Sequence, residues 1–149
     1  MMSTYFDTGA LLKLYLEEEF SDLVTDYVTA QGISVAIHAF HEVEMENALR
    51  LKVFRREISA RQCRGALHRI ESDVRDGLLI RRSVDWPDAL KEALRISAAV
   101  TERSGCRTLD ILHVALALCW ECSTFLSLDD RQIKAARLVH LKVLDVRTL

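Results

Sequence analysis

Four acidic residues have positions in the sequence that favour a shared chemical role. Asp7 follows a short apolar run, Asp129 follows a second one, and Asp110 opens a long apolar stretch. Glu44 lies in a segment of helical periodicity. Carboxylates at the ends of parallel strands lie at the sheet edge where α/β proteins bind ligands and metals. The hypothesis is that these four acids converge on one site.

Four carboxylates in one site would repel each other, because like charges at short range raise each other's pKa. A hard divalent cation removes this conflict, and Mg²⁺ or Mn²⁺ also keeps water ligands that phosphate oxygens can replace. Such a site supports phosphoryl chemistry, with one ion generating hydroxide and a second stabilising the leaving oxygen. Whether one or two ions bind stays open. Asp110 and Asp129 also have a structural explanation, since a carboxylate near a helix N-terminus stabilises that helix without a metal.

Glu44 has two neighbouring glutamates that compete for the same role. On a helix, Glu42 and Glu46 share one face, whereas Glu44 points about 160° away from each of them. Val43 and Leu51 lie nearer to Glu44 than to the other two acids. We therefore expect Glu44 to face the apolar side of its helix and the flanking glutamates to be solvated.

The composition is that of one folded domain spanning residues 1–149. Half of the 149 residues are hydrophobic, 28% are charged, and the formal net charge is −2, which argues against nucleic-acid binding through overall charge. The apolar runs are too short and too often interrupted by charge to span a membrane. Residues 1–4 lack the basic and long apolar regions of a signal peptide, so we expect a cytoplasmic protein.

The cysteines, histidines and basic residues outside the acidic set have mainly structural interpretations. Cys119 and Cys122 end an apolar stretch and are expected to be core thiols, since no second ligand pair for zinc exists. The segment around His38 and His41 lacks the H-E-x-x-H pattern of a zinc enzyme. His113 is expected to be a hydrogen-bonded core residue.

Two groups of basic residues are either solvated helix faces or a rim that attracts RNA. The first group is Lys52, Arg55, Arg56, Arg61 and Arg64, and the second is Arg131, Lys134 and Arg137.

Short apolar strands alternate with amphipathic helices along the whole chain. This order predicts a three-layer α/β/α sandwich with a mainly parallel central sheet of about five strands. The expected strands are residues 4–6, 33–37, 78–80, 124–127 and 141–144. The expected helices are residues 9–17, 21–30, 39–54, 60–75, 86–101, 109–120 and 129–138, with Thr8 and Ser59 as caps of the first and the fourth.

Four motifs that contain these acids occur in the order found in a known family. They are Tyr5-Phe6-Asp7-Thr8-Gly9-Ala10-Leu11-Leu12-Lys13-Leu14-Tyr15, Glu44-Met45-Glu46-Asn47-Ala48-Leu49, Arg107-Thr108-Leu109-Asp110-Ile111-Leu112-His113-Val114-Ala115 and Phe125-Leu126-Ser127-Leu128-Asp129-Asp130-Arg131-Gln132. With them the chain resembles the PIN domains, and more narrowly the VapC-type toxin ribonucleases of prokaryotic toxin–antitoxin pairs. Gly9 stands where the family more often has serine, and Ser127 where it more often has threonine.

The resemblance implies Mg²⁺- or Mn²⁺-dependent hydrolysis of RNA phosphodiesters with a 5′-phosphate product. It carries over Asp7, Glu44, Asp110 and Asp129 as catalytic metal ligands, with Asp129 rather than its neighbour Asp130 selected by the motif's spacing. Thr8 and Ser127 would be hydroxyls near the metal or its waters. It also implies a homodimer and a cognate VapB-like antitoxin.

Arg107 and two rival functions stay open at this point. Arg107, three residues before Asp110, would contact a substrate phosphate or pair with an acid at the rim of the site, unless it forms an ordinary surface ion pair.

One rival function is a catalytically silent module that binds RNA or a partner. The other is a phosphatase with Asp7 as nucleophile, although that chemistry normally needs a second acid at position 9, where this chain has Gly9.

Overall fold

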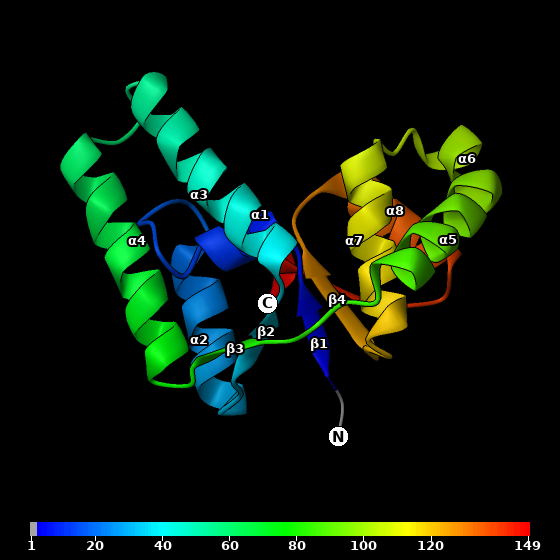
Figure 1. The fold of residues 1–149 in the computed structure, drawn as a ribbon, viewed down its shortest axis with the longest axis horizontal. Helices are drawn as coiled ribbons and strands as arrows, with labels where there is room; N and C mark the ends of the chain where they lie inside the picture. The colour runs from blue at the N-terminus through cyan, green and yellow to red at the C-terminus, as the bar shows by residue number, and fades with distance from the viewer. Residues whose placement is uncertain (1–2) are drawn as a thin grey trace. The chain divides into compact units, whose positions relative to one another are not determined.

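The computed structural model describes residues 3–149. Met1 and Met2, which belong to the segment examined for a signal peptide, lie outside the described residues. The chain forms two compact units, coloured along the chain in Figure 1: the first unit contains residues 3–10 and 83–149, and the second unit contains residues 11–82. The organisation of residues 1–149 as one nuclease domain stays a prediction.

The first unit contains a three-stranded parallel sheet in the order β1-β4-β5. Its strands are β1 (Thr4–Phe6), β4 (Thr124–Ser127) and β5 (Lys142–Asp145). Tyr5 is opposite Phe125, and their rings stack with centroids 5.5 Å apart. Because β1 and β4 run in the same direction, the residues that follow them emerge at the same edge of the sheet.

The helices of the first unit pack against this sheet and against one another. They are α5 (Trp86–Ile96), a π-helical turn (Ser97–Thr101), α6 (Glu102–Ser104), α7 (Thr108–Cys119), α8 (Asp130–Leu138) and a 3₁₀ turn (Val146–Thr148). Helix α7 is apolar on nearly all sides and packs against both α5 and α8, and α8 packs on β4 and β5. The long helix predicted for residues 86–101 is thus α-helical only to Ile96.

The second unit contains a two-stranded parallel sheet and three longer helices. Its elements are α2 (Ser21–Gln31), β2 (Val35–Ile37), α3 (Ala39–Phe54), α4 (Ala60–Arg75) and β3 (Leu79–Arg81). Helices α3 and α4 pack side by side (Figure 1). Gly32 ends α2 in the left-handed conformation with φ 58°, and Ser59 and Gln62 form a capping box that begins α4.

Helix α1 (Thr8–Leu12) is much shorter than the predicted helix of residues 9–17. The amides of Leu14 and Tyr15 donate to carbonyls three residues earlier, which tightens the turn. The Tyr15 hydroxyl donates to Asp73, and Arg69 donates to the Tyr15 carbonyl, both from α4. These tertiary contacts, which have no local sequence signal, explain why the helix ends early.

The α/β class and the parallel pairing of the strands are confirmed. All five predicted strands are present, and they pair as the three-stranded sheet of the first unit and the two-stranded sheet of the second. A single five-stranded central sheet within three layers stays a prediction. In the described part of the chain no helix is both long and apolar enough to cross a bilayer.

The thiols fit the structural interpretation with one exception. Cys63, Cys106 and Cys122 are buried, and all four cysteines are free thiols. Cys119 is exposed at the end of α7, so its prediction as a core residue is wrong. Cys119 is the last residue of α7, and its side chain lines a surface pocket together with Glu92 and Arg95 of α5.

Candidate metal centre

Asp7 follows β1 directly and is almost fully buried, with 2% of its surface exposed. Its Oδ1 atom accepts a hydrogen bond from the Ala10 amide at 2.6 Å, so Asp7, and not Thr8 as predicted, caps the start of α1. Its Oδ2 atom accepts from the Ser127 hydroxyl at 2.5 Å. The carboxylate is therefore oriented on both sides by groups from α1 and β4.

Asp129 is the N-cap of α8 and is linked to Asp7 through Ser127. Its amide donates to the Ser127 Oγ atom at 3.0 Å. Its Oδ1 atom accepts from the amides of Arg131 and Gln132 at 2.9 and 3.1 Å. Within residues 3–149 its Oδ2 atom accepts no hydrogen bond, and the residue is exposed. Asp129 thus keeps one carboxylate oxygen available to a ligand.

The neighbouring Asp130 has a different partner. Its Oδ1 atom accepts from the Arg147 guanidinium at 2.6 Å, and its side chain is 82% exposed. Arg147 also pairs with Asp145, the last residue of β5. Asp130 thus has a local ion-pair partner, and Asp129 stays the predicted ligand of the two.

Asp110 lies in the first turn of α7 and is half-buried. Its Oδ2 atom accepts from the Arg107 amide at 3.0 Å, which satisfies a free amide at the start of the helix. Its Oδ1 atom accepts from the Gln132 Nε2 atom at 3.0 Å. The backbone amide of Gln132 also donates to Asp129, so Gln132 is hydrogen-bonded to both acids.

The three acids of the first unit therefore form one connected set. Ser127 bonds to Asp7 and Asp129, and Gln132 bonds to Asp129 and Asp110. Exposure increases along the set, from buried Asp7 through half-buried Asp110 to exposed Asp129. A cluster of carboxylate oxygens with one exposed end is the type of donor set that hard divalent cations prefer.

The charge on Asp7 is disfavoured in this structure. Burial raises the pKa of the Asp7 carboxyl, and the negative charge of Asp129 acts in the same direction. The hydrogen bonds from Ser127 and Ala10 and the nearby His113 lower this pKa, but burial outweighs them. A divalent cation would reverse the balance, because it stabilises the carboxylate form. The cluster of carboxylate oxygens and the raised pKa of Asp7 are therefore both compatible with a bound divalent cation.

Thr8 and His113 lie in the buried layer next to Asp7. The Thr8 Oγ1 atom is hydrogen-bonded to His113 Nε2 at 3.3 Å, and the Tyr5 hydroxyl is hydrogen-bonded to His113 Nδ1 at 2.7 Å. All three residues are buried. The prediction that His113 is a hydrogen-bonded core residue is confirmed, and the Thr8 hydroxyl is held in a defined position beside the acid set.

Comparisons with known proteins bear on the fold. No protein-family model and no curated protein matches the sequence. Among solved structures, the chain is similar to one in the "Crystal Structure of FitAcB from Neisseria gonorrhoeae", with a TM-score of 0.70 and 13% sequence identity, over 98% of this chain and 99% of that chain. The fold is that of a PIN domain. At this identity the likeness concerns the fold alone.

Glu44, the fourth acid of the PIN-like motif set, belongs to the second unit, on α3. Its predicted environment is partly wrong, because Val43 is 65% exposed and Leu51 is 38% exposed. The buried stripe of α3 consists instead of His41, Met45 and Leu49, which recur every four residues. Glu44 borders this stripe and is half-buried. It stays a predicted ligand.

The flanking glutamates of α3 both pair with arginines. Glu42 is half-buried and accepts from Arg81 at 2.6 Å, so its prediction as a solvated residue is only partly correct. Glu46 is exposed and accepts from Arg50 at 2.8 Å. Such surface pairs contribute little to stability, and they give both glutamates a local explanation.

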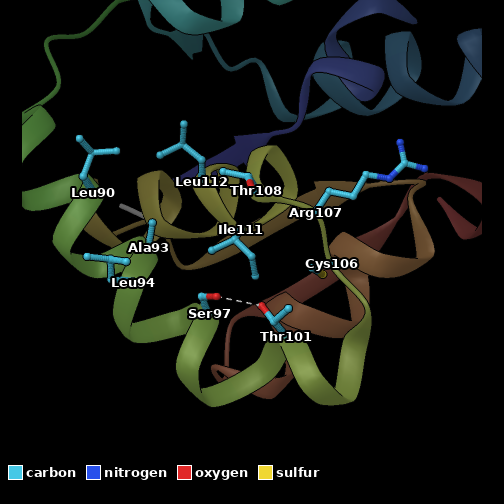
Figure 2. A pocket seen from close by; sticks show the side chains of 10 residues that line it. All are labelled: Leu90, Ala93, Leu94, Ser97, Thr101, Cys106, Arg107, Thr108, Ile111 and Leu112. Carbon is cyan, nitrogen blue, oxygen red and sulfur yellow. Dashed lines mark hydrogen bonds between the residues drawn. The ribbon is translucent and has the colours of Figure 1, made fainter.

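Arg107 is exposed and lines an apolar pocket in the first unit of the chain. Its guanidinium forms no ion pair with any of residues 3–149, so of the alternatives left open the contact with a substrate phosphate stays a prediction. Its backbone amide does bond to Asp110. The pocket, about 420 Å³ in volume, lies between α5, the π-helical turn and α7 (Figure 2). Arg107 is its one cationic lining residue.

The basic groups considered for an RNA rim differ in their environment. Lys52 is engaged in ion pairs with Glu18 at 2.5 Å and Glu57 at 3.1 Å. The remaining members of both groups are exposed: Arg55, Arg56, Arg61, Arg64, Arg131, Lys134 and Arg137. Exposure is compatible with either interpretation, a solvated face or a rim.

Gln132 is the residue of this site that sequence reasoning missed. A signal was present, because Gln132 stands three residues after the N-cap Asp129, where a glutamine often completes a capping box. In the structure its side chain donates to Asp110 instead of to the N-cap backbone. The spacing predicts a local cap, and only the packing of α8 on α7 reveals the second acid.

Proposed function

We propose that the protein is a Mg²⁺- or Mn²⁺-dependent endoribonuclease in which Asp7, Asp110, Asp129 and Glu44 hold the metal. The observation that carries the proposal is the hydrogen-bonded set of three acids that ends in a buried carboxylate, Asp7. Glu44 joins the set on the strength of the sequence motif. A bound ion would activate water and stabilise the leaving oxygen of a phosphodiester, which leaves a 5′-phosphate product.

The residues around the acids have defined parts in this proposal. Ser127 orients Asp7 and is itself held by the Asp129 amide, so a loss of its hydroxyl would loosen two ligands together. The Thr8 hydroxyl, hydrogen-bonded to His113, belongs to the residue next to Asp7 and would be a polar group near the metal or its waters. Arg107 presents an exposed guanidinium that pairs with no group among residues 3–149, and such a group is suited to a phosphate oxygen of the substrate.

The biological role is proposed from the motif resemblance. The protein acts as the toxin of a toxin–antitoxin pair, is inhibited by a VapB-like antitoxin, forms a homodimer and cleaves RNA in the cytoplasm. A small open reading frame directly upstream of the gene would be the first observation to seek, followed by co-purification of its product with this protein.

The test of the enzymatic proposal is cleavage of end-labelled RNA by purified protein. We expect cleavage with Mn²⁺ or Mg²⁺, none with excess chelator, and loss of cleavage in Asp7→Asn and Asp110→Asn. Asp130→Asn is the matched control, because this acid pairs with Arg147 instead of joining the set, and it should keep full activity. Cleavage that survives in the Asp7→Asn/Asp110→Asn double variant would refute the mechanism.

One observation favours a second candidate, a silent module that binds RNA or a partner. Asp129 caps α8, and Asp110 accepts from the N-cap amide of α7, so both have a structural reason to be present without catalysis. Asp7 distinguishes the candidates, since a buried carboxylate with a raised pKa is unfavourable in a purely structural role. Calorimetry that detects no binding of Mn²⁺ would favour the silent module.

A further inference from the structure

We propose that Gln132 is a positioning residue that holds Asp110 in register with Asp129 for a shared divalent cation. The inference rests on the proposed function. Gln132 is 8% exposed and lies in the first turn of α8. Its backbone amide donates to Asp129 Oδ1 at 3.1 Å, and its side-chain Nε2 atom donates to Asp110 Oδ1 at 3.0 Å. One residue thus sets the position of two acids from different helices.

The other atom of the Gln132 carboxamide is unsatisfied. Its Oε1 atom is buried and accepts no hydrogen bond from residues 3–149. The orientation of the amide is determined by Asp110, because exchanging the nitrogen and oxygen would place Oε1 against a carboxylate oxygen. A buried acceptor without a donor costs free energy of folding.

This cost indicates what Gln132 is present for. The neighbouring residues Ile133, Ala135 and Ala136 are buried and apolar, so an apolar side chain of similar length would fit the packing without an unsatisfied oxygen. The amide donor toward Asp110 is the feature that such a side chain would lose. Stability alone therefore does not explain a glutamine at this position, whereas orientation of Asp110 does.

The chemistry of a neutral donor suits this role. Carboxylates that bind metals are commonly oriented by hydrogen bonds from residues outside the metal's own ligands. A lysine or arginine at position 132 would neutralise Asp110 and compete with the cation. A glutamine orients one oxygen of Asp110 and leaves its negative charge for the metal.

The experiment compares Gln132→Met with the wild-type protein in two measurements. The first is thermal unfolding in excess chelator, where we expect an unchanged or higher midpoint because the unsatisfied acceptor is removed. The second is calorimetric titration with Mn²⁺, where we expect a dissociation constant about 10- to 100-fold higher. Gln62→Met is the matched control: it removes the capping-box glutamine of α4, so it should lower the midpoint and leave Mn²⁺ binding unchanged.

A double variant tests whether Gln132 acts through Asp110. If it does, adding Gln132→Met to Asp110→Asn weakens Mn²⁺ binding no further than Asp110→Asn does alone, because coupled residues are not additive. This comparison stays valid even where Gln132→Met changes the stability of the fold.

The possible failures are distinguishable. Wild-type affinity for Mn²⁺ in Gln132→Met would overturn the inference and leave the proposed function intact. A lower midpoint with unchanged affinity would show a purely structural role and would also overturn it. Absence of Mn²⁺ binding in the wild-type protein would refute the proposed metal site, and the role of Gln132 with it.

Discussion

Opposing effects act on the pKa of the Asp7 carboxyl, and a bound cation would favour its ionised form. Burial raises the pKa of its carboxyl, whereas the hydrogen bonds from Ser127 and Ala10 act against this rise. Without a metal, the ionised form is costly for the folded protein at neutral pH. Residues that are unfavourable for stability but suited to chemistry are typical of functional sites.

Asp7→Asn should therefore stabilise the metal-free protein, by about 1 kcal/mol in the free energy of unfolding at pH 8. Since the pKa of Asp7 is raised in the folded state, the wild-type carboxyl contributes its full stability below its unfolded pKa and loses it as pH rises. The advantage of the asparagine should be larger at pH 8 than at pH 4.5. Urea unfolding in chelator at both pH values measures this, and a less stable variant at pH 8 would contradict it.

Gly9 is the residue of the first motif that departs from the family's usual serine. A Cβ atom at this position would lie 3.6 Å from Asp7 Oδ1, which is ordinary van der Waals contact, and Gly9 is exposed. The departure therefore does not reflect a lack of space.

Gly9→Ser should fold normally and bind Mn²⁺ as the wild-type protein does. A modest gain of about 0.5 kcal/mol in stability is expected, because serine loses less backbone entropy in a helix than glycine. Thermal unfolding and Mn²⁺ titration measure both effects. Loss of Mn²⁺ binding in this variant would mean that the glycine itself is needed beside Asp7.

At the scale of elements, the ends of helices provide the acids. Asp7 caps α1, Asp129 caps α8, and Asp110 lies in the first turn of α7. The partial positive charge of a helix N-terminus favours each carboxylate there. The same acids thus have a helix-stabilising role and the proposed metal-binding role, and variants can separate the two.

Asp129→Asn and Asp129→Ala should separate these roles. Asparagine is as good an N-cap as aspartate, so Asp129→Asn should keep the stability of the protein and lose Mn²⁺ affinity. Alanine removes the cap as well and should cost about 1 kcal/mol in addition. Ser59→Ala, at the N-cap of α4, should cost a similar amount with Mn²⁺ binding unchanged. Equal stability of the two Asp129 variants in urea unfolding would contradict the capping role.

At the scale of the whole molecule, the chain folds into two units, and the segment that forms one of them is inserted between the two segments that form the other. The first unit is made from both ends of the chain, and it contains Asp7, Asp110 and Asp129. The second unit is the continuous segment between them and contains Glu44. Three acids of the proposed quartet are therefore connected within the first unit, whereas Glu44 is included on the strength of the sequence motif alone.

Glu44→Gln should weaken Mn²⁺ binding by at least 10-fold in calorimetric titration, since it removes one anionic ligand of the proposed four. Glu46→Gln is the matched control on the same helix, because Glu46 is exposed and paired with Arg50. It should leave the affinity unchanged. Equal affinities for the two variants would exclude Glu44 from the metal site and reduce the proposed set to Asp7, Asp110 and Asp129.

Features with local causes were predictable from the sequence. The bounds of α3 and α4 agree with prediction because their starts are set by His38 and Ser59, which cap through residues only three positions away. The end of α1 was not predictable, because Tyr15 is bound by α4, more than fifty residues further along the chain. The prediction that Val43 marks the apolar side of α3 was wrong for a related reason. Which side of a helix is buried depends on the elements that pack against it, and these are set by the tertiary structure.

The sequence by itself determined the identity of the candidate acids and their places after strands and at helix starts, because these depend on short motifs and local periodicity. The tertiary structure decided which groups connect them. Ser127 bonds to Asp7 across 120 positions, Gln132 bonds to Asp110 across 22, and Arg147 pairs with Asp130 across 17. Such contacts arise from how strands pair and helices pack, and no local pattern encodes them.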